Sequence, residues 1–340
     1  MRICAECFKA QDWKDFFSES RVFPQKCSFC GRKADVVEFG NLFPFIHKLL
    51  TLFKKSDSGS RVYEIINDDF GIFADNKVAR KILKSTIAKA QCGYSIDDSV
   101  AYIDDVVTVK ERWLQIKNEV MKEHRFFTVD PTDESWDVYF ASDEKYKKIK
   151  KGSKFFRGRI NEDAENLFYE ESELGMPPPE KARAGRINPY GIPCLYLTKN
   201  VDSIIYELRA SHGDKISIGT FVASDDLNII DFDYRPLVFD DVCRQKGVEK
   251  LQDTVREFLL KKQIGFDLSK PIHRYGVKEI EYVPTQYICE YIKIHGADGV
   301  MFNSAVHRGG KNLVLFKSDK VKFVGAEVKT VDEPVMRFCQ

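Results

Sequence analysis

Apolar residues recur every three or four positions in three stretches of the first half of the chain. These stretches are PFIHKLLTLFKK at residues 44–55, NKVARKILKSTIAKA at 76–90 and VTVKERWLQIKNEVMKEH at 107–124. In the third stretch, Trp113, Ile116 and Val120 fall along one face of a helix. This spacing is the period of an amphipathic α-helix. We therefore predict a small helical domain over residues 38–125.

Beyond residue 150, short apolar runs of strand length alternate with helical patterns. The strand-like runs are SKFFRGRI, PCLYLT, KISIGTFVA, LNIIDF, GVMF, NLVLF and VKFVGAEV. The helical patterns are VDSIIYELRAS, with a cap near Asn200 or Asp202, VEKLQDTVREFLLKK and TQYICEYIKIHG. This mixture predicts an α+β domain over residues 150–325, with polar residues at strand ends and in loops. Residues 126–149 are expected to be a linker, and residues 326–340 a C-terminal tail.

Four cysteines near the N-terminus have the spacing of a metal site. They form the pattern C-x2-C-x19-C-x2-C and are Cys4, Cys7, Cys27 and Cys30. Two such turns can complete a tetrahedral thiolate shell around zinc, and a closed four-cysteine shell leaves no coordination position for a substrate. We therefore predict a zinc-binding module over residues 1–37 in which the metal holds structure. The alternative is a pair of buried CxxC turns without metal.

Composition and charge limit the classes of protein that fit. The 340 residues are 43% apolar, which is enough to fill the cores of two or three domains. The net charge of +1 gives no global field toward nucleic acid or a membrane. No apolar run reaches the ~18–20 residues of a membrane span, and the N-terminus has no export signal, so a cytoplasmic protein is expected. In that reducing compartment the scattered cysteines 92, 194, 243, 289 and 339 are expected to be buried small hydrophobes.

Four motifs of the second half occur in the order found in a known family. They are FFRGR, GRINPYGIPCLYLTKNVDSIIYE, YVPTQYICEYIKIHGADG and GADGVMFNSAVHRGGKNLVLF. Together they resemble the RES domain, which is named for an arginine, a glutamate and a serine and whose members are bacterial toxins that destroy NAD. The resemblance covers residues 150–325. It implies a fold related to ADP-ribosyltransferases, with a mixed sheet and NAD held in a cleft between short sheets.

Cleavage of the nicotinamide–ribose bond requires a carboxylate beside the sugar and cations on the pyrophosphate, because the sugar passes through an oxocarbenium-like state. The resemblance places Glu207, on the helix after PCLYLT, in the first role. It places Arg157, in FFRGR, and Arg186, in the Gly-Arg-x-Asn turn, in the second role, since a guanidinium is a bidentate donor for phosphate oxygens. Arg159 and Arg183 lie close to these two positions in the sequence.

Three further residues follow from the resemblance. It implies that Tyr196 faces the substrate from an apolar strand, where a tyrosine is otherwise usually core. It implies that the Ser304 hydroxyl contacts the nicotinamide or the ribose and is not a nucleophile, because the spacing of His307 and Asp298 does not establish a Ser-His-Asp relay. Asn312 is assigned to the same pocket. The expected catalytic set is Glu207, Arg157, Arg186, Tyr196 and Ser304, and the expected NAD-binding set is Arg157, Arg186, Tyr196, Ser304 and Asn312.

The helical region resembles the HEPN-related segment that accompanies some RES domains. A HEPN ribonuclease needs an arginine and a histidine a few residues apart on one helix. Neither His47 nor His124 has an arginine four to six residues before it, so we expect no nuclease activity.

These observations together predict an NAD-degrading toxin or defence effector, of the toxin–antitoxin or phage-defence kind, controlled by its N-terminal half. The reaction expected is NAD glycohydrolysis or phosphorolysis, and water, phosphate or a macromolecular acceptor all stay open. One alternative is an ADP-ribosyltransferase. Another is an inactive module that binds nucleic acid through the cysteine module and the basic run at residues 143–159. NAD is the expected small-molecule partner and no membrane is expected, whereas an antitoxin or regulatory protein, a homo-oligomer and nucleic acid stay open as partners.

Overall fold

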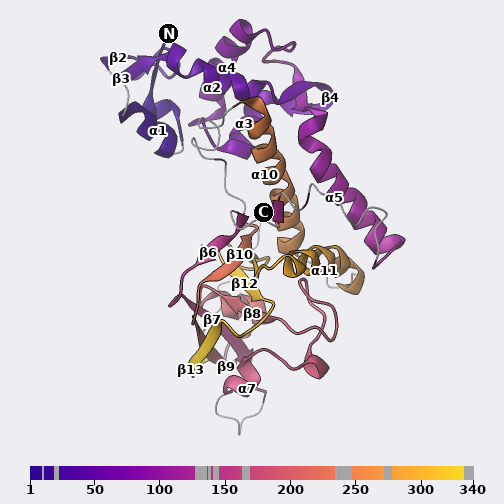
Figure 1. The fold of residues 1–340 in the computed structure, drawn as a ribbon. Coiled ribbons are helices and arrows are strands. Elements are labelled where there is room, and N and C mark those ends of the chain that lie inside the picture. The colour runs from indigo at the N-terminus through magenta and orange to yellow at the C-terminus, as the bar shows by residue number, and fades with distance from the viewer. Residues whose placement is uncertain are drawn as a thin grey trace. The chain divides into compact units, whose positions relative to one another are not determined.

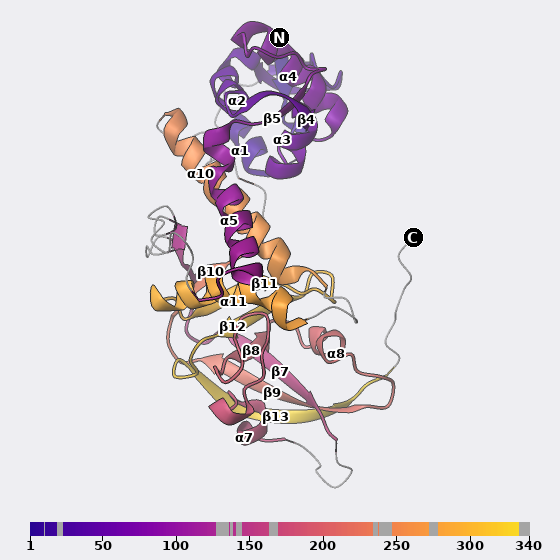
Figure 2. The same cartoon turned by 90° about the vertical axis from the view of Figure 1, so that its right-hand side faces the viewer.

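The computed structural model describes most of the chain in two compact units (Figures 1 and 2). The described residues are 1–9, 11–18, 23–126, 136, 139–140, 145–162, 169–233, 237, 247–271 and 278–332. The first unit comprises Met1–Glu111 and Arg235–Leu260, and the second comprises Arg112–Tyr234 and Lys261–Gln340. Parts of the expected linker and C-terminal tail, and Cys243 and Cys339, lie outside the described residues.

The first unit opens with a three-stranded antiparallel sheet in the order β1–β3–β2. Its elements are β1 (Arg2–Cys4), η1 (Ala5–Cys7), α1 (Gln11–Ser18), β2 (Phe23–Lys26), β3 (Lys33–Glu38) and η2 (Phe39–Asn41). The rest of the unit is helical apart from one antiparallel strand pair. These elements are α2 (Phe43–Leu50), β4 (Phe53–Arg61), α3 (Val62–Phe70), α4 (Asn76–Ala90), β5 (Ser99–Tyr102) and parts of α5 (Asp104–Lys122) and α10 (Val248–Ser269).

The three predicted helical stretches of the first half coincide with α4 and overlap α2 and α5. Helix α4 begins where the Asp75 side chain accepts a hydrogen bond from the Val78 N–H at 2.7 Å, which satisfies one of the free donors of the first turn. The β4–β5 pair was not predicted. Strand β4 is polar and carries a register shift between Lys55 and Ser60, so the alternation that signals a half-buried strand is missing.

The segment around Cys7 shares a core with the helices that follow. Phe8 forms a bridge with Phe73, and its ring stacks on Trp13 with 5.5 Å between centroids. The Ala74 N–H donates to the Cys7 carbonyl at 2.9 Å, so main-chain bonds also join the two segments. Loss of order at the cysteines would therefore reach the helical part of this unit.

The second unit is built on one eight-stranded mixed sheet, in the order β13–β9–β7–β8–β12–β11–β10–β6. Neighbouring strands are antiparallel except β10 and β11, which are parallel. The strands are β6 (Lys147–Ile149), β7 (Lys154–Ile160), β8 (Leu195–Thr198), β9 (Lys215–Ala223), β10 (Leu227–Asp231), β11 (Gly299–Asn303), β12 (Lys311–Leu315) and β13 (Val321–Thr330). The predicted mixture of α and β structure is thus confirmed.

Two neighbouring strands inside the sheet, β7 and β8, are joined by a single residue pair. Strands β7 and β8 are paired only through Phe156 and Thr198, whereas β7 pairs with β9 from Lys154 to Ile160. Thr198 also pairs with Asn312 on its other side. The sheet therefore consists of a three-stranded and a five-stranded part that meet at Phe156 and Thr198.

Helices α7 (Glu171–Leu174), α8 (Ser203–Leu208) and α11 (Lys278–Ile294) contact this sheet, and the unit also contains the 3-10 turn η4 (Pro179–Lys181). Helix α8 packs directly on β7, because Ile204 lies over Gly158: a Cβ at that glycine would be 2.1 Å from Ile204 Cγ2. Ile204, Ile216 and Ile218 form the apolar cluster beneath α8.

Helix α8 starts at Ser203 with Asp202 at the N-cap position, one of the two predicted positions, although the Asp202 side chain makes no capping hydrogen bond. The start of α11 differs from the sequence prediction. Helix α11 starts at Lys278, before the predicted start at Thr285, and holds Pro284 within it. A proline there removes one main-chain donor and usually ends a helix, which is why the sequence pattern placed the boundary after it. Among the described helices, none is long and apolar enough to cross a membrane.

Candidate active site and metal site

Two of the predicted site residues bind the same carboxylate oxygen of a third. The Ser304 hydroxyl donates to Glu207 Oε1 at 2.6 Å, and the Asn312 amide donates to the same oxygen at 2.8 Å. Glu207 is exposed in the last turn of α8, and the described residues place no donor within hydrogen-bond distance of its second oxygen, Oε2. The carboxylate is therefore held from one side and open on the other.

The sheet explains why residues so distant in sequence meet. Strands β11 and β12 are antiparallel neighbours, and the turn between them is closed by a bond from the Ser304 N–H to the Gly310 carbonyl at 2.8 Å. Asn312 pairs with Thr198 at the end of β8, and α8 begins a few residues later. Both donors thus reach Glu207 through strand pairing.

The Ser304 hydroxyl is fixed by the main chain around it. It accepts hydrogen bonds from the N–H groups of Val306, at 3.2 Å, and His307, at 3.0 Å. Its own proton points to Glu207, so the hydroxyl acts as a donor to the carboxylate. The His307 ring bonds to Ser203 instead, and Asp298 Oδ2 accepts from Lys320 Nζ at 2.9 Å. This geometry contains no Ser-His-Asp relay of Ser304, His307 and Asp298.

Arg157 is a half-buried arginine held by a carbonyl group. Its Nη1 donates to the Gly175 carbonyl at 2.7 Å, and no ion pair to a carboxylate of the described residues is formed by its guanidinium. Burial lowers the pKa of Arg157, and the positive charge of Arg159 lowers it further. A bound anion would relieve both effects, so the side chain has the electrostatic character of an anion-binding group.

The structure distinguishes Arg157 from Arg159, its neighbour in FFRGR. The Arg159 guanidinium lies 4.5 Å from the ring centroid of Tyr169, which occupies one of its faces. Arg183 is exposed, and its main-chain carbonyl accepts from the Asn188 amide at 3.0 Å. Arg157 therefore differs from Arg159 in that no aromatic ring covers it among the described residues.

Arg186 lies in a turn that helix α11 holds in place. Thr285 Oγ1 donates to the Arg186 carbonyl at 2.6 Å, and Gln286 Nε2 donates to the carbonyl of Gly185 at 2.8 Å and to that of Asn188 at 3.0 Å. The Arg186 guanidinium lies 5.7 Å from the ring centroid of Tyr282. The motif YVPTQY thus fixes the backbone of the arginine-bearing turn.

Tyr196 is bound to the same turn. Its hydroxyl donates to Asn188 Oδ1 at 2.7 Å and accepts from the Ile187 N–H at 3.3 Å. Burial raises the pKa of Tyr196 well above its ordinary value, so the hydroxyl remains a donor. A Cβ at Gly185 would lie 2.4 Å from this hydroxyl, which explains the glycine there.

The predicted residues therefore form separate groups. Glu207, Ser304 and Asn312 are hydrogen-bonded together, whereas Arg186 lies in the turn at residues 185–188, to which Tyr196 is hydrogen-bonded from β8. No hydrogen bond or ion pair within the described residues joins Arg157, Arg186 or Tyr196 to Glu207. Through the sheet, however, Thr198 pairs both with Phe156, which precedes Arg157, and with Asn312. Two strand spacings of about 4.8 Å thus separate the backbone at Arg157 from that at Asn312.

Sequence reasoning missed the residues that hold these groups. Asn188 is 3% exposed and uses its amide to bind main-chain carbonyls of the turn and Tyr196. Gln286 and Thr285 hold the turn from α11. An asparagine directly before a proline is a turn signal, but the burial of Asn188 and the contact of its turn with α11 depend on the tertiary fold.

The four N-terminal cysteines form a compact cluster of sulfur atoms. All four Sγ atoms lie within 4.8 Å of one another, with 3.5 Å between Cys4 and Cys30, 3.5 Å between Cys7 and Cys27, and 3.9 Å between Cys4 and Cys7. A tetrahedral zinc with Zn–S bonds of about 2.3 Å requires sulfur separations of about 3.8 Å. The donor set and its spacing therefore fit zinc.

Burial and the neighbouring sulfur atoms shift the pKa values of these thiols in different directions. Burial, together with the hydrogen bond to Cys30, raises the pKa of Cys4 to about 12. Burial acts in the same direction on Cys27, but hydrogen bonds from the N–H groups of Cys30 and Phe29 outweigh it and lower its pKa to about 7. A bound divalent cation would neutralise thiolates that otherwise repel each other.

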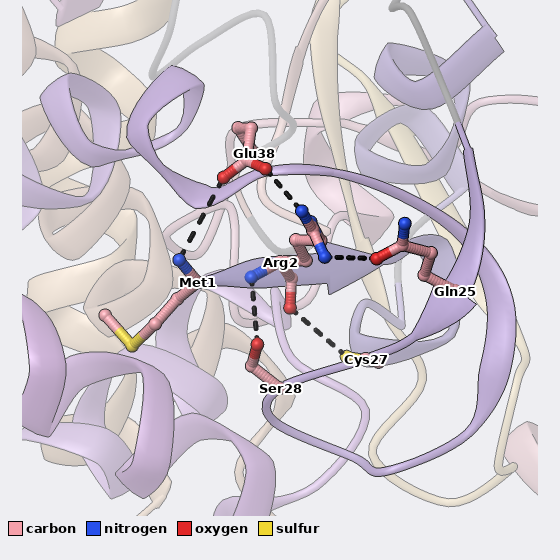
Figure 3. A network of polar contacts seen from close by, with 6 residues as sticks. All are labelled: Met1, Arg2, Gln25, Cys27, Ser28 and Glu38. Atoms are coloured by element: carbon pink, nitrogen blue, oxygen red, sulfur yellow. Dashed lines mark hydrogen bonds and ion pairs between the residues drawn. The ribbon is translucent and has the colours of Figure 1, made fainter.

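Figure 3 shows how the N-terminal strand is fixed to the second cysteine turn. The Arg2 N–H donates to Ser28 Oγ at 2.9 Å, and the Cys27 sulfur lies 3.7 Å from the Arg2 carbonyl. The Arg2 side chain bonds to Glu38, at 3.0 Å, and to Gln25. These contacts hold β1 beside the Cys27–Cys30 turn.

The sequence profile of the RES domain matches residues 159–337, more than half of the chain. The chain therefore belongs to the RES domain family. Arg186, Tyr196, Glu207, Ser304 and Asn312 lie within the matched residues, and Arg157 lies two positions before them. No curated protein matches the sequence. Membership of this family is consistent with an NAD-related function and implies NAD as substrate.

Proposed function

We propose that this protein degrades NAD by cleaving the bond between nicotinamide and ribose. The observation that carries the proposal is the Glu207 carboxylate, with Ser304 and Asn312 both bound to Oε1 and with Oε2 open. A carboxylate fixed in this way can face a developing positive charge without first having to reorganise.

In the proposed reaction the C1′–N bond of the nicotinamide riboside breaks, and its electron pair leaves with nicotinamide. The ring nitrogen loses its positive charge, and positive charge develops on C1′ and the ring oxygen of the ribose. Glu207 Oε2 stabilises that charge, while Ser304 and Asn312 keep Oε1 in place. Water or phosphate then bonds to C1′ and gives up a proton, or a macromolecular acceptor does so.

The arginines and Tyr196 take the binding roles in this proposal. Arg157 and Arg186 contact the pyrophosphate, where a guanidinium can bind two phosphate oxygens at once. Tyr196 lies beside the nicotinamide or the ribose, and Ser304 and Asn312 line the same pocket. The proposal also includes a fold related to ADP-ribosyltransferases, with NAD between the two parts of the sheet. The placement of NAD between the two parts is supported by the sheet, because these parts are joined only by the pairing of Phe156 with Thr198.

We further propose that the N-terminal half controls this activity, as expected for a toxin or a defence effector. A four-cysteine zinc site would stabilise the first unit without contacting NAD, because a closed thiolate shell offers no open position. An antitoxin, a regulatory protein or a second copy of the chain are the candidate partners.

Incubation of the full-length protein with NAD tests the proposal. Release of nicotinamide is the expected result. The second product identifies the acceptor: ADP-ribose indicates water, an ADP-ribose phosphate indicates phosphate, and label on an added protein or nucleic acid indicates transfer. Absence of nicotinamide release under all three conditions would contradict the proposal and favour the inactive nucleic-acid-binding module.

A further inference from the structure

The turn between β11 and β12 is attached to helix α8 by a contact that takes no direct part in the proposed reaction. His307 lies in this turn, and Ser203 and Tyr206 lie on α8. We propose that His307 is a positioning residue that fixes Ser304 and Glu207 relative to each other. This inference rests on the proposed function, because it concerns the geometry of the same carboxylate.

The turn itself is closed by short main-chain bonds. The Ser304 N–H donates to the Gly310 carbonyl at 2.8 Å, and the Gly310 N–H donates to the His307 carbonyl at 3.0 Å. The His307 N–H in turn donates to Ser304 Oγ at 3.0 Å. His307 and Ser304 therefore move as one unit, and any contact that fixes His307 also fixes the Ser304 hydroxyl.

A hydrogen bond connects this turn to the first residue of α8. His307 Nδ1 lies 2.8 Å from Ser203 Oγ, and Ser203 is fully buried. Leaving a buried hydroxyl without a hydrogen-bond partner costs folding free energy. Removal of the His307 side chain would therefore destabilise the folded protein at Ser203. The approach is close: a Cβ at Gly310 would lie 2.8 Å from Ser203 Oγ and 3.0 Å from His307 Nδ1.

A ring contact strengthens the attachment one turn further along the helix. The His307 and Tyr206 rings are stacked, with 4.6 Å between centroids and 8° between planes. Tyr206 immediately precedes Glu207 in the sequence. His307 therefore contacts α8 at its first residue, Ser203, and at Tyr206, the residue next to Glu207.

Helix α8 depends on such external contacts. It spans only Ser203–Leu208, has no side-chain cap at its start, and ends at Arg209, whose φ of 52° is left-handed. An isolated helix of this length is unstable in water. Its position is set by Ile204 over Gly158 on one side and by His307 on the other.

The first test is the kinetics of NAD cleavage by variants of the full-length protein. His307→Ala should lower kcat at least ~10-fold and change KM less than ~3-fold, since misplacing a group in the site affects the transition state most. His307→Asn keeps an amide atom near the Nδ1 position and should recover most of the lost kcat. His212→Ala, the same change at an exposed histidine, is the control and should leave the kinetics unchanged.

A double-mutant cycle separates positioning from general damage to the fold. Ser203→Ala and His307→Ala remove the two ends of one contact, so the double variant should lose little more than the worse single variant. Additive losses, an unchanged kcat in His307→Ala, or a change in KM alone would each overturn the proposal.

Hydrogen exchange of the free protein tests the attachment without reference to NAD. His307→Ala should speed amide exchange in residues 304–310 and in residues 203–208 together. Faster exchange in the turn alone would overturn the inference. If the wild-type protein releases no nicotinamide, the proposed function fails, while this measurement still decides whether His307 attaches the turn to α8.

Discussion

Asn312 Nδ2 lies 2.8 Å from Glu207 Oε1, although 105 positions separate the two residues in the sequence. The contact is made because Asn312 stands opposite Thr198 in the sheet, and α8 starts shortly after that strand. Ser304 reaches the same oxygen from the neighbouring turn. Glu207 Oε1 is thus hydrogen-bonded within the protein, and the proposed reaction uses Oε2.

Replacing Asn312 should weaken the hold on Glu207. A hydrogen bond to a charged group contributes about 1.5–3 kcal/mol, so Asn312→Ala should lower kcat about 10–100-fold. Asn312→Asp should lose more at neutral pH, because it places a second negative charge beside Glu207. Steady-state kinetics of nicotinamide release measure both effects. A normal kcat in both variants would mean that the bond has no part in catalysis.

The two arginines of FFRGR should behave differently. Arg157→Ala should weaken NAD binding and raise KM about 10–100-fold, the effect of losing a charged contact to phosphate. Arg159→Ala is the matched control, because the Arg159 guanidinium stacks on Tyr169. Calorimetric titration with NAD distinguishes them. Normal affinity in Arg157→Ala, or an equal loss in both variants, would contradict the assignment.

Gly158 should tolerate no side chain. A Cβ there would lie 2.1 Å from Ile204 Cγ2, so Gly158→Ala must displace α8, and overpacking of this kind costs about 1–3 kcal/mol. We expect lower stability in denaturant unfolding and reduced NAD cleavage. Gly40→Ala adds the same methyl group where no atom lies within 4 Å and serves as the control. Equal stability of the two variants would show that α8 does not pack on β7 as described.

The purified protein should carry about one zinc per chain. Cys4→Ser or Cys30→Ser should lose the metal and disorder the first ~35 residues, because thiolate ligation supplies folding free energy that so small a segment lacks. The main-chain bridge and ring contact between Phe8 and Phe73 link this segment to the helices of the same unit, so we expect these helices to be destabilised as well. Cys92→Ser, outside the cluster, should keep its zinc. Elemental analysis measures this directly, and a metal-free wild-type protein would contradict it.

The sequence predicted much of the second unit because its strands and helices have clear apolar periodicity. Each predicted strand run overlaps one strand of the sheet, whereas the short edge strand β6 was not predicted. The motifs of the family pointed to Glu207, Ser304 and Asn312, which the structure places within hydrogen-bonding distance. Their meeting could not be derived from spacing alone, since it depends on the order of strands β8, β12 and β11.

Other features have no local signal in the sequence. The polar strand β4 lacks alternating apolar residues, and the narrow contact between β7 and β8 arises from pairing across the sheet. The support of the Arg186 turn by Gln286 comes from a helix about one hundred residues away. Such long-range contacts are set by the tertiary fold, which propensity and periodicity do not encode.

The most direct test of the account compares nicotinamide release by the wild-type protein and Glu207→Gln at saturating NAD. The amide keeps the shape of the side chain and an oxygen that can accept from Ser304 and Asn312, but it has no charge to offer a ribosyl cation. We predict that the variant folds, binds NAD with similar affinity and loses at least ~10²-fold in kcat. Release of nicotinamide at a near wild-type rate by Glu207→Gln would contradict the central role of this carboxylate.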